Sequence, residues 1–506
     1  MHDLVQTHHA VLRNYPIAGH LRFLLEGVRP EIRQYFFEGD KDGAPFSRDK
    51  RALVYQRAKR ALDKRPFGTQ YDVYGDQYEW LHHSIAPRPV SPDPHRVIIG
   101  HSGPCTQPYS ASVLNISAMS YGALSANAVL ALNRGAKLGG FAHDTGEGGV
   151  SPCHREAGGD LIWEIGSGYF GCRRPDGSFD PDQFAKAASD PQIKMVEVKL
   201  SQGAKPGHGG VLPAAKVTAE IAAIRGVPMG EDCISPAAHS AFSTPVELMQ
   251  FIARIRGLSG GKPAGFKLCV GHPWEVMALC KAMLDTGITP DFIVVDGKEG
   301  GTGAAPLEFM DHMGMPLRDG LSFVHNALVG CGLRNRLRLG ASGKIVSAFD
   351  MARVMALGAD WCNAARGFMF AVGCIQAQTC HTGLCPTGVT AQDPYRQRAI
   401  VVPDKAERVF NFHRNTVQAL AELVAAAGLD HPGQLGPQHF LRRGTADRVI
   451  SYAQQYETLE PGQLLADPGS AGRFGQAWSL ARSHSFARGD GDAGLGAGRV
   501  QPARER

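Results

Sequence analysis

"DFIVVDGKEGG", residues 291–301, joins a short apolar run to a glycine-rich turn that carries charged side chains. A nearly continuous apolar run is typical of a parallel strand that is covered on both faces. The segment before it, "PWEVMALCKAMLDTG" (273–287), has apolar residues at helical spacing. The stretch therefore predicts a strand that follows a helix and ends in a loop whose glycines let the backbone approach a ligand.

The same unit recurs along the chain. Further helical patterns lie between the apolar runs, for example at 125–139, 244–258 and 347–359. Eight units favour a (β/α)₈ barrel, an α/β fold, over a doubly wound open sheet, which predicts fewer repeats. The other seven runs are "SVLNISAMS" (112–120), "GGFAHDTGEGG" (139–149), "MVEVKLSQGA" (195–204), "DCISPAA" (232–238), "GFKLCVG" (265–271), "RLRLGASGK" (336–344) and "DWCNAARG" (360–367).

Additional segments flank the predicted barrel. Residues 1–95 are expected to form an N-terminal helical extension, with helical spacing in "LRFLLEGV" and "RALVYQRAKRAL" and a proline-rich end, "IAPRPVSPDPHR". The barrel is assigned to residues 96–430, which end in a helical pattern at 406–429. Residues 431–506 are expected to form a C-terminal helical segment and a disordered tail rich in glycine and arginine.

Composition narrows the class of protein. The net charge is only +5 over 506 residues, with no long Lys/Arg run, which argues against a nucleic-acid partner. The longest apolar stretches are far shorter than the ~20 residues that span a bilayer, and the N-terminus lacks the features of a secretion signal. We therefore expect a cytoplasmic protein. Thiols stay reduced in that compartment, so the 11 cysteines are read as buried apolar residues plus one metal site.

Polar side chains recur where the predicted strands end. The carboxyl ends of barrel strands converge on one mouth, so these side chains are expected to line one pocket. Glycine-rich loops such as "GASGK" and "AARG" are suited to binding a phosphate, and Lys267 could place a positive charge at the pyrimidine edge of a flavin. No G-x-G-x-x-G motif lies between a strand and a helix, so direct NAD(P) binding by a Rossmann unit is not supported.

"GCIQAQTCHTGLCPTGVTAQ", residues 373–392, holds Cys374, Cys380 and Cys385. Zinc could use these thiols together with His381, although the gaps between the cysteines fit structural zinc sites poorly. Three thiolates also suffice for an iron–sulfur cluster that lacks one iron corner. Three buried thiols are the plain alternative, and a disulfide is the weakest reading. The spacing by itself leaves these alternatives open.

The motifs between residues 110 and 430 resemble the FMN-binding domain of glutamate synthases. "AMSYGALS", "TGEGG", "QGAKPGHGG", "CISPAAHS", "FKL", "GGTGAAP" and "TAQDP" recur in the family's order. The cysteine loop is similar to the family's "GC…C…CPxGVATQ" run, which binds a 3Fe–4S cluster. The resemblance thus implies an oxidoreductase that acts on the CH–NH₂ group and carries FMN and a 3Fe–4S cluster.

The resemblance also implies roles for individual residues. It implies that ammonia and 2-oxoglutarate form an imine, that reduced FMN gives the imine a hydride, and that Glu147 transfers the proton while lysines pair with substrate carboxylates. The substrate group is Glu147, Lys199, Gln202 and Lys205. The flavin group is Met119, Ser120, Thr145, Lys267, Gly300 and Gly301, with Gly343, Lys344 and Arg366 near the phosphate. The cluster ligands are Cys374, Cys380 and Cys385.

Departures from the family pattern leave the substrate open. His208 replaces a carboxylate, Asp144 replaces an amide, and a single histidine, His239, remains where the family has two. A flavin subunit like that of N-methylglutamate synthase, another amino-acid oxidoreductase, and a non-catalytic electron-transfer scaffold are the alternatives. The chain begins Met1-His2, without the cysteine that releases ammonia from glutamine. We therefore expect ammonium, an amine or partner-supplied nitrogen, an electron donor such as a ferredoxin or reductase subunit, and homo-oligomer formation as a further option.

Overall fold

A computed structural model describes residues 2–6, 8–93, 95–444 and 448–489. Its centre is a closed barrel of eight parallel strands, which confirms the predicted α/β barrel. Strand β13 closes the barrel by pairing with β4, with Ala364 opposite Ile116. In order, the strands are β4 (Leu114–Ile116), β5 (His143–Asp144), β6 (Leu161–Ile165), β7 (Ile193–Lys199), β10 (Ala264–Leu268), β11 (Phe292–Asp296), β12 (Arg338–Ser342) and β13 (Trp361–Ala364).

One predicted barrel strand was wrong. The run at 232–238 contributes only β9 (Cys233–Ile234), which pairs with β8 (Val211–Leu212) in an antiparallel ribbon outside the barrel. The eighth strand of the barrel is instead β6, "LIWEI", which was not predicted as a strand. All five β6 residues are buried, whereas the 232–238 run has only two adjacent apolar residues before a proline, too few to span a barrel wall.

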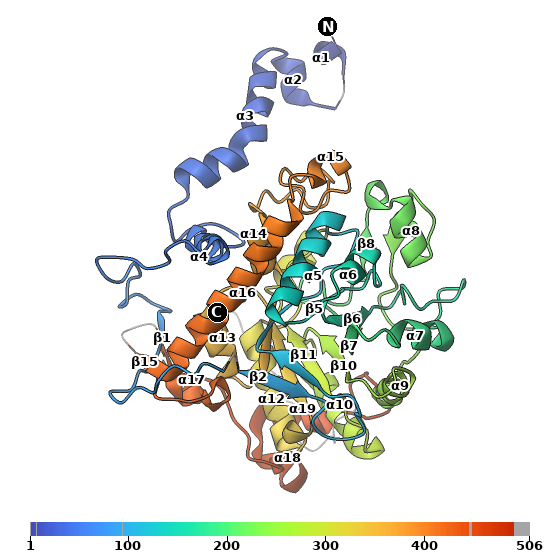
Figure 1. Cartoon of the computed structure of the whole chain (residues 1–506), viewed down its shortest axis with the longest axis vertical. Coiled ribbons are helices and arrows are strands. Elements are labelled where there is room, and N and C mark those ends of the chain that lie inside the picture. Colours follow the sequence, from blue (N-terminus) through green and yellow to red (C-terminus); the bar gives the residue numbers. More distant parts are fainter. Residues whose placement is uncertain (1, 7, 94, 445–447, 490–506) are drawn as a thin grey trace, which may run out of the picture.

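The helices of the barrel lie outside the strands (Figure 1). The predicted helical patterns form α5, α9, α10, α13 and α16. Thr244 and Glu247 form a capping box that begins α9, and Ser125 caps α5. The barrel helices are α5 (Ala126–Gly139), α6 (Pro152–Glu156), α7 (Pro181–Ala188), α8 (Ala219–Arg225), α9 (Pro245–Leu258), α10 (Pro273–Thr286), α11 (Leu307–His312), α12 (Leu317–Gly330), α13 (Ala348–Met355), α14 (Arg366–Val372), α15 (Pro394–Gln397) and α16 (Val402–Ala426).

A hairpin covers the amino end of the barrel. It is formed by β2 (Arg96–Ile99) and β3 (Tyr109–Ser112). Arg96 donates to the carbonyl of Gly140, just before β5, and the backbone N–H of Thr106 donates to Gly261, just before β10. Because the hairpin contacts the loops that enter the strands, the end where the strands leave the barrel stays open for a site.

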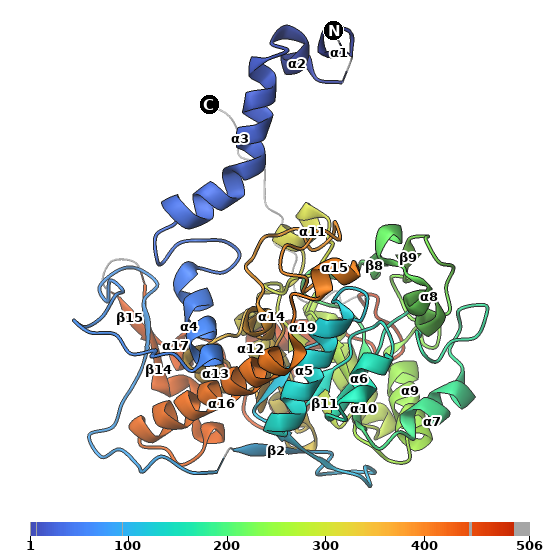
Figure 2. The same ribbon diagram turned by 45° about the horizontal axis from the view of Figure 1, so that its top comes forward.

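Segments from the two ends of the chain meet beside the barrel. Strand β1 (Glu79–Leu81) pairs with β14 (Phe440–Arg443), which pairs with β15 (Val449–Ser451), a sheet that the sequence patterns did not predict. Helix α4 (Arg48–Lys59) packs on α16. Helices α1 (His2–Val5), α2 (Ala10–Asn14) and α3 (Ala18–Ile32) extend away from the barrel (Figures 1 and 2). After β15 come α17 (Tyr452–Gln455), α18 (Gln463–Ala466) and α19 (Gly472–Leu480).

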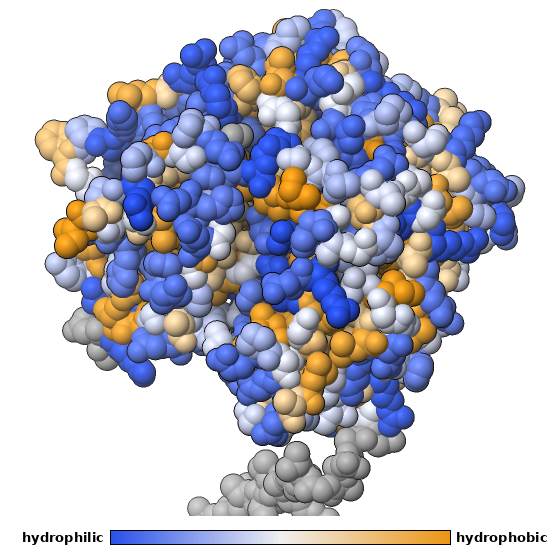
Figure 3. All heavy atoms as spheres, turned by 60° about the horizontal axis from the view of Figure 1, so that its bottom comes forward, coloured by the Kyte–Doolittle hydropathy of each residue, from blue (hydrophilic) through white to orange (hydrophobic). Residues whose placement is uncertain are grey.

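Within the described ranges, none of the helices is both long and apolar enough to cross a bilayer. On the face shown in Figure 3, hydrophobic residues lie in small groups among hydrophilic ones. Most of the tail predicted to be disordered, from residue 490 onward, lies outside the described residues.

Candidate active site at the barrel mouth

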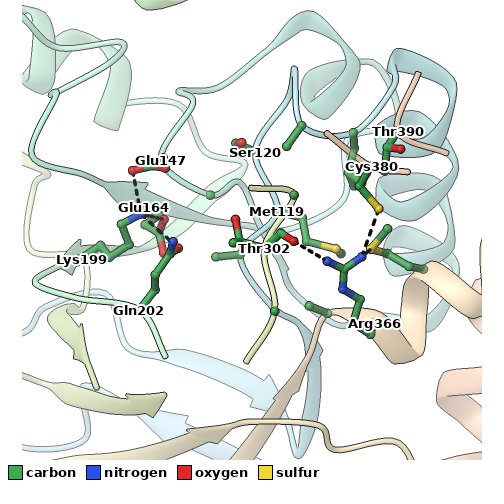
Figure 4. Close-up of a pocket in the computed structure, with 18 residues that line it drawn as sticks. Met119, Ser120, Glu147, Glu164, Lys199, Gln202, Thr302, Arg366, Cys380 and Thr390 are labelled. Atoms are coloured by element: carbon green, nitrogen blue, oxygen red, sulfur yellow. Dashed lines mark hydrogen bonds and ion pairs between the residues drawn. The ribbon is translucent and has the colours of Figure 1, made fainter. Parts of the chain in front are cut away.

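An open cavity lies at the carboxyl end of the strands. Loops that follow β4, β5, β7, β11 and β13 form its wall, and Glu164 reaches it from β6. Figure 4 shows that ionisable side chains gather at two ends, with Met119 between them. The lining residues are Ala118, Met119, Ser120, Ala123, Leu124, Gly146, Glu147, Glu164, Lys199, Gln202, Gly301, Thr302, Gly303, Ala365, Arg366, Met369, Cys380 and Thr390.

Lys199 organises one end of the cavity. Its Nζ donates to Glu147 Oε2 at 2.6 Å and lies 3.5 Å from Gln202 Oε1. It also lies 4.0 Å from Glu164 Oε1. Lys199 ends β7 and Glu147 follows β5, so two strand ends bring together three of the four residues predicted to bind and process the substrate.

The charge of Glu147 follows from its surroundings. Burial acts most strongly and raises its pKa, but the charge and hydrogen bond of Lys199, with the charges of Arg225 and Lys205, together outweigh burial, so the pKa of Glu147 lies below its ordinary value. The carboxylate is therefore ionised at neutral pH and accepts a hydrogen bond from Lys199. A substrate carboxylate that bound Lys199 would weaken this pair and make Glu147 easier to protonate.

Lys205 and His239 are buried near this end of the cavity and do not line it. Lys205, the fourth predicted substrate residue, is 2% exposed and does not line the cavity. Burial lowers the pKa of Lys205. His239 Nε2 lies 2.8 Å from the carbonyl of Lys199, and burial lowers the pKa of His239 to about 4. His239 is therefore neutral, and its ring N–H can fix the backbone that carries Lys199.

Arg366 organises the opposite end. It donates to the carbonyl of Thr302 at 3.0 Å, and its Nη1 lies 3.8 Å from Cys380 Sγ. Lys216 donates to the carbonyls of Ala123 at 2.9 Å and Cys380 at 3.3 Å. Two cationic side chains thus hold Cys380 at the cavity wall. In this structure the Arg366 guanidinium contacts Thr302 and Cys380. Its expected contact with a phosphate stays a prediction.

The other two cysteines of the loop are buried behind Cys380. Burial raises the pKa of Cys374 to about 11, and the neighbouring thiols of Cys380 and Cys385 act in the same direction. Burial also acts to raise the pKa of Cys385, but hydrogen bonds from Thr387 and Thr390 outweigh it, so its pKa is lowered. One loop therefore holds three neighbouring thiols in different environments.

The predicted flavin residues divide into two groups. Met119, Ser120, Gly301 and Arg366 line the cavity. The other five do not line it. Thr145 is fully buried, where it donates to the carbonyl of Gly146 and accepts from the N–H of Glu164. The remaining residues that do not line the cavity are Gly300, Lys267, Gly343 and Lys344.

Lys267 has partners that the sequence reasoning missed. Its ammonium forms ion pairs with Glu164 and with Glu197, the latter at 3.3 Å. Glu164 lines the cavity and Lys267 does not; the expected place of Lys267 at the pyrimidine edge of a flavin stays a prediction. Glu164 could have been predicted only by recognising β6 as a barrel strand, and the sequence patterns did not reveal that strand.

Known proteins resemble this chain along most of its length. The family model described as the conserved region in glutamate synthase matches residues 90–430. The chain is 38% identical over 490 residues to the glutamate synthase large subunit-like protein YerD of Bacillus subtilis (strain 168), covering 89% of this chain and 93% of that protein. It is 35% identical over 346 residues to an archaeal glutamate synthase (NADPH) of Methanocaldococcus jannaschii, covering 68% of this chain and 63% of that protein.

Among solved structures, a point mutant of flavocytochrome b2 with benzoylformate aligns with a TM-score of 0.45 and 12% identity over 78% of each chain.

Proposed function

Because the chain belongs to the glutamate synthase family, we propose that it is an oxidoreductase that uses FMN and a 3Fe–4S cluster to convert 2-oxoglutarate and ammonia, or nitrogen supplied by a partner, into glutamate. The observation that carries the proposal is the cavity with two different ends. Lys199 and Glu147 offer charge and proton exchange at one end, and Cys380 lies at the other (Figure 4).

The residues around the cavity fit a flavin. Ala118, Met119 and Met369 give an apolar wall for a flat ring, while Ser120 offers a hydrogen bond to its polar edge. When bound, FMN would supply the hydride that reduces an imine.

The cysteine loop fits an iron–sulfur cluster better than zinc. Zinc at about 2.3 Å from each sulfur would draw the thiols to roughly 3.8 Å from one another. The three Sγ atoms do not form a group within 4.8 Å, whereas three carboxyl groups of the described chain do. Cys374, Cys380 and Cys385 would hold the cluster, with Arg366 and Lys216 offsetting the thiolate charge.

The substrate would bind by its charges. The Lys199 ammonium would pair with a carboxylate of 2-oxoglutarate, and Lys205 is proposed as a second cation for the substrate. Release of Glu147 from Lys199 would raise the proton affinity of Glu147, so that it could pass a proton to the imine nitrogen. Gln202, 3.5 Å from Lys199 Nζ, would orient the same carboxylate.

The experiment is to purify the protein without oxygen and determine its cofactors and nitrogen donor. Acid-released flavin should run as FMN on chromatography, and analysis should find iron and sulfide rather than zinc. After chemical reduction, 2-oxoglutarate with ammonium should reoxidise the flavin, whereas glutamine without a partner protein should not. Released FAD, stoichiometric zinc, or reoxidation by glutamine alone would each overturn the corresponding part of the proposal.

A further inference from the structure

Five charged side chains fill the interior of the barrel beneath the cavity. Asp144, Glu164 and Glu197 come from the neighbouring strands β5, β6 and β7, Lys267 from β10, and Asp296 from β11. The first four are at most 4% exposed. Charged groups buried to this degree need partners, or they become neutral by exchanging protons.

Lys267 lies among the acids. It forms ion pairs with Glu164 and with Glu197, and Asp144, Glu164 and Glu197 each place an oxygen within 4.8 Å of the others. Asp296 accepts hydrogen bonds from the N–H of Gly203 and the hydroxyl of Ser342. The protein therefore supplies the cation for this group of acids through its own ammonium.

The carboxyl groups outnumber the cations that face them. Four carboxyl groups surround Lys267, and the next cation is Lys199, which already pairs with Glu147. Strands β4 and β13 carry no charged residue, and the one charged residue of β12, Arg338, pairs with Asp360. Like charges this close cannot all stay ionised, so the group retains protons.

The electrostatics of the group agree with this geometry. Burial, with the charges of Glu197 and Glu164, raises the pKa of Asp144 well above its ordinary value. Burial raises the pKa of Glu197 to about 7, although Lys267 opposes it. Apart from its ion pair with Lys267, Glu197 has no hydrogen-bond partner among the described residues, and a buried carboxyl group with so few partners tends to keep its proton.

Glu164 connects this buried group to the cavity. Its Oε2 touches Lys267, its Oε1 lies 4.0 Å from Lys199 Nζ, and Lys199 reaches Glu147 at 2.6 Å. A path of side chains therefore runs from the barrel interior through Glu164 and Lys199 to the residue proposed to protonate the substrate.

We propose that Asp144 and Glu197 hold protons beside Lys267 and supply one to Glu147, by way of Glu164 and Lys199, each time an imine is reduced. This rests on the proposed function. Reduction breaks the π bond of C=N; the hydride of the reduced flavin, with its electron pair, forms C–H, and the proton of Glu147 forms N–H. Glu147 is then a carboxylate again. It takes a proton from the buried group when the next 2-oxoglutarate weakens its pair with Lys199, and the buried group regains one from water.

The first test needs no turnover. Infrared spectra of the full-length protein, compared between about pH 6 and about pH 8, should show the C=O stretch of a protonated carboxyl group that disappears as the group titrates as a coupled unit. Glu197→Gln should remove or shift this signal. Asp144→Asn is the second variant, in case the first does not fold. Glu275→Gln, on α10 outside the barrel, removes a half-buried carboxyl group and should leave the signal unchanged.

The second test measures proton transfer from the buried carboxyl groups to Glu147. The single-turnover rate with 2-oxoglutarate and ammonium should fall at higher pH in the wild type, and this fall should move toward acid by roughly one pH unit in Glu197→Gln, because one proton-holding group is gone. An absent carboxyl signal in a protein that aminates 2-oxoglutarate would overturn the proton store. An unchanged pH profile would overturn its delivery role. A carboxyl signal in a protein that aminates no 2-oxo acid would support the store and refute the proposed function.

Discussion

His413 should make the stability of the barrel sensitive to acid. It lies on α16, where its ring stacks on Phe141 at 3.9 Å between centroids and its Nε2 lies 2.9 Å from Ser112 Oγ. Burial lowers the pKa of His413 to about 3. The folded protein therefore keeps this ring neutral at a pH where the unfolded chain, with a histidine pKa of about 6.5, binds a proton.

The size of the effect follows from proton linkage. Because the folded pKa is lowered, the histidine has no effect well above pH 6.5 and favours unfolding increasingly as the pH falls from about 6.5 toward about 3. Between about pH 7 and about pH 5 the unfolded state gains about 2 kcal/mol from this one proton. The pKa of His154 is likewise lowered by burial, to about 3. The total loss of stability of the wild type between these pH values should therefore exceed the contribution of His413 alone.

The assay is urea unfolding at about pH 7 and about pH 5 for the wild type, His413→Gln and the control His312→Gln, whose histidine is exposed on α11. Glutamine can still reach Ser112, so His413→Gln should fold, with lower stability at pH 7 because the ring stacking is lost. Its loss of stability between the two pH values should be about 2 kcal/mol smaller than that of the wild type. Equal losses in the wild type and His413→Gln would refute the buried, neutral ring.

Three substitutions test the site and its frame. Glu147→Gln should keep bound flavin, measured by absorbance, yet lose ~10²–10⁴-fold in turnover because an amide does not exchange a proton near neutral pH; normal turnover would reassign the proton to another group. Cys380→Ser should lose the cluster signal in electron paramagnetic resonance, whereas Cys105→Ser should keep it; an unchanged Cys380→Ser spectrum would remove this ligand. Gly203→Ala should lower the melting temperature, since a Cβ there would lie 1.7 Å from the carbonyl oxygen of Gly297; an unchanged value would contradict this contact.

The sequence predicted the barrel because seven strands end in loops with a recognisable composition. Strand β6 was missed, although all five of its residues are buried. Its charged residue, Glu164, does not account for the omission, because the predicted strand β7 also carries charged residues, Glu197 and Lys199. The closed barrel explains why Glu164 can be buried, since Lys267 on β10 pairs with its carboxylate.

The same omission limited the prediction of the site. Glu147, Lys199 and Gln202 could be found because they follow recognisable strands in glycine-rich loops. The place of Lys267 at a strand end was visible in the sequence, whereas its ion pairs with Glu164 and Glu197 were not; its role beside a flavin stays a prediction. Side-chain pairing inside a barrel depends on contacts between distant strands, and such contacts leave no local pattern in a single sequence.

The most direct test of the central claim follows nitrogen into the product. The protein, purified and chemically reduced without oxygen, is mixed with 2-oxoglutarate and ¹⁵N-ammonium, and the product is identified by mass spectrometry while flavin reoxidation is recorded. The proposal predicts ¹⁵N-glutamate in proportion to the flavin reoxidised. Reoxidation without labelled glutamate, or no reoxidation in protein that contains both FMN and the cluster, would contradict it.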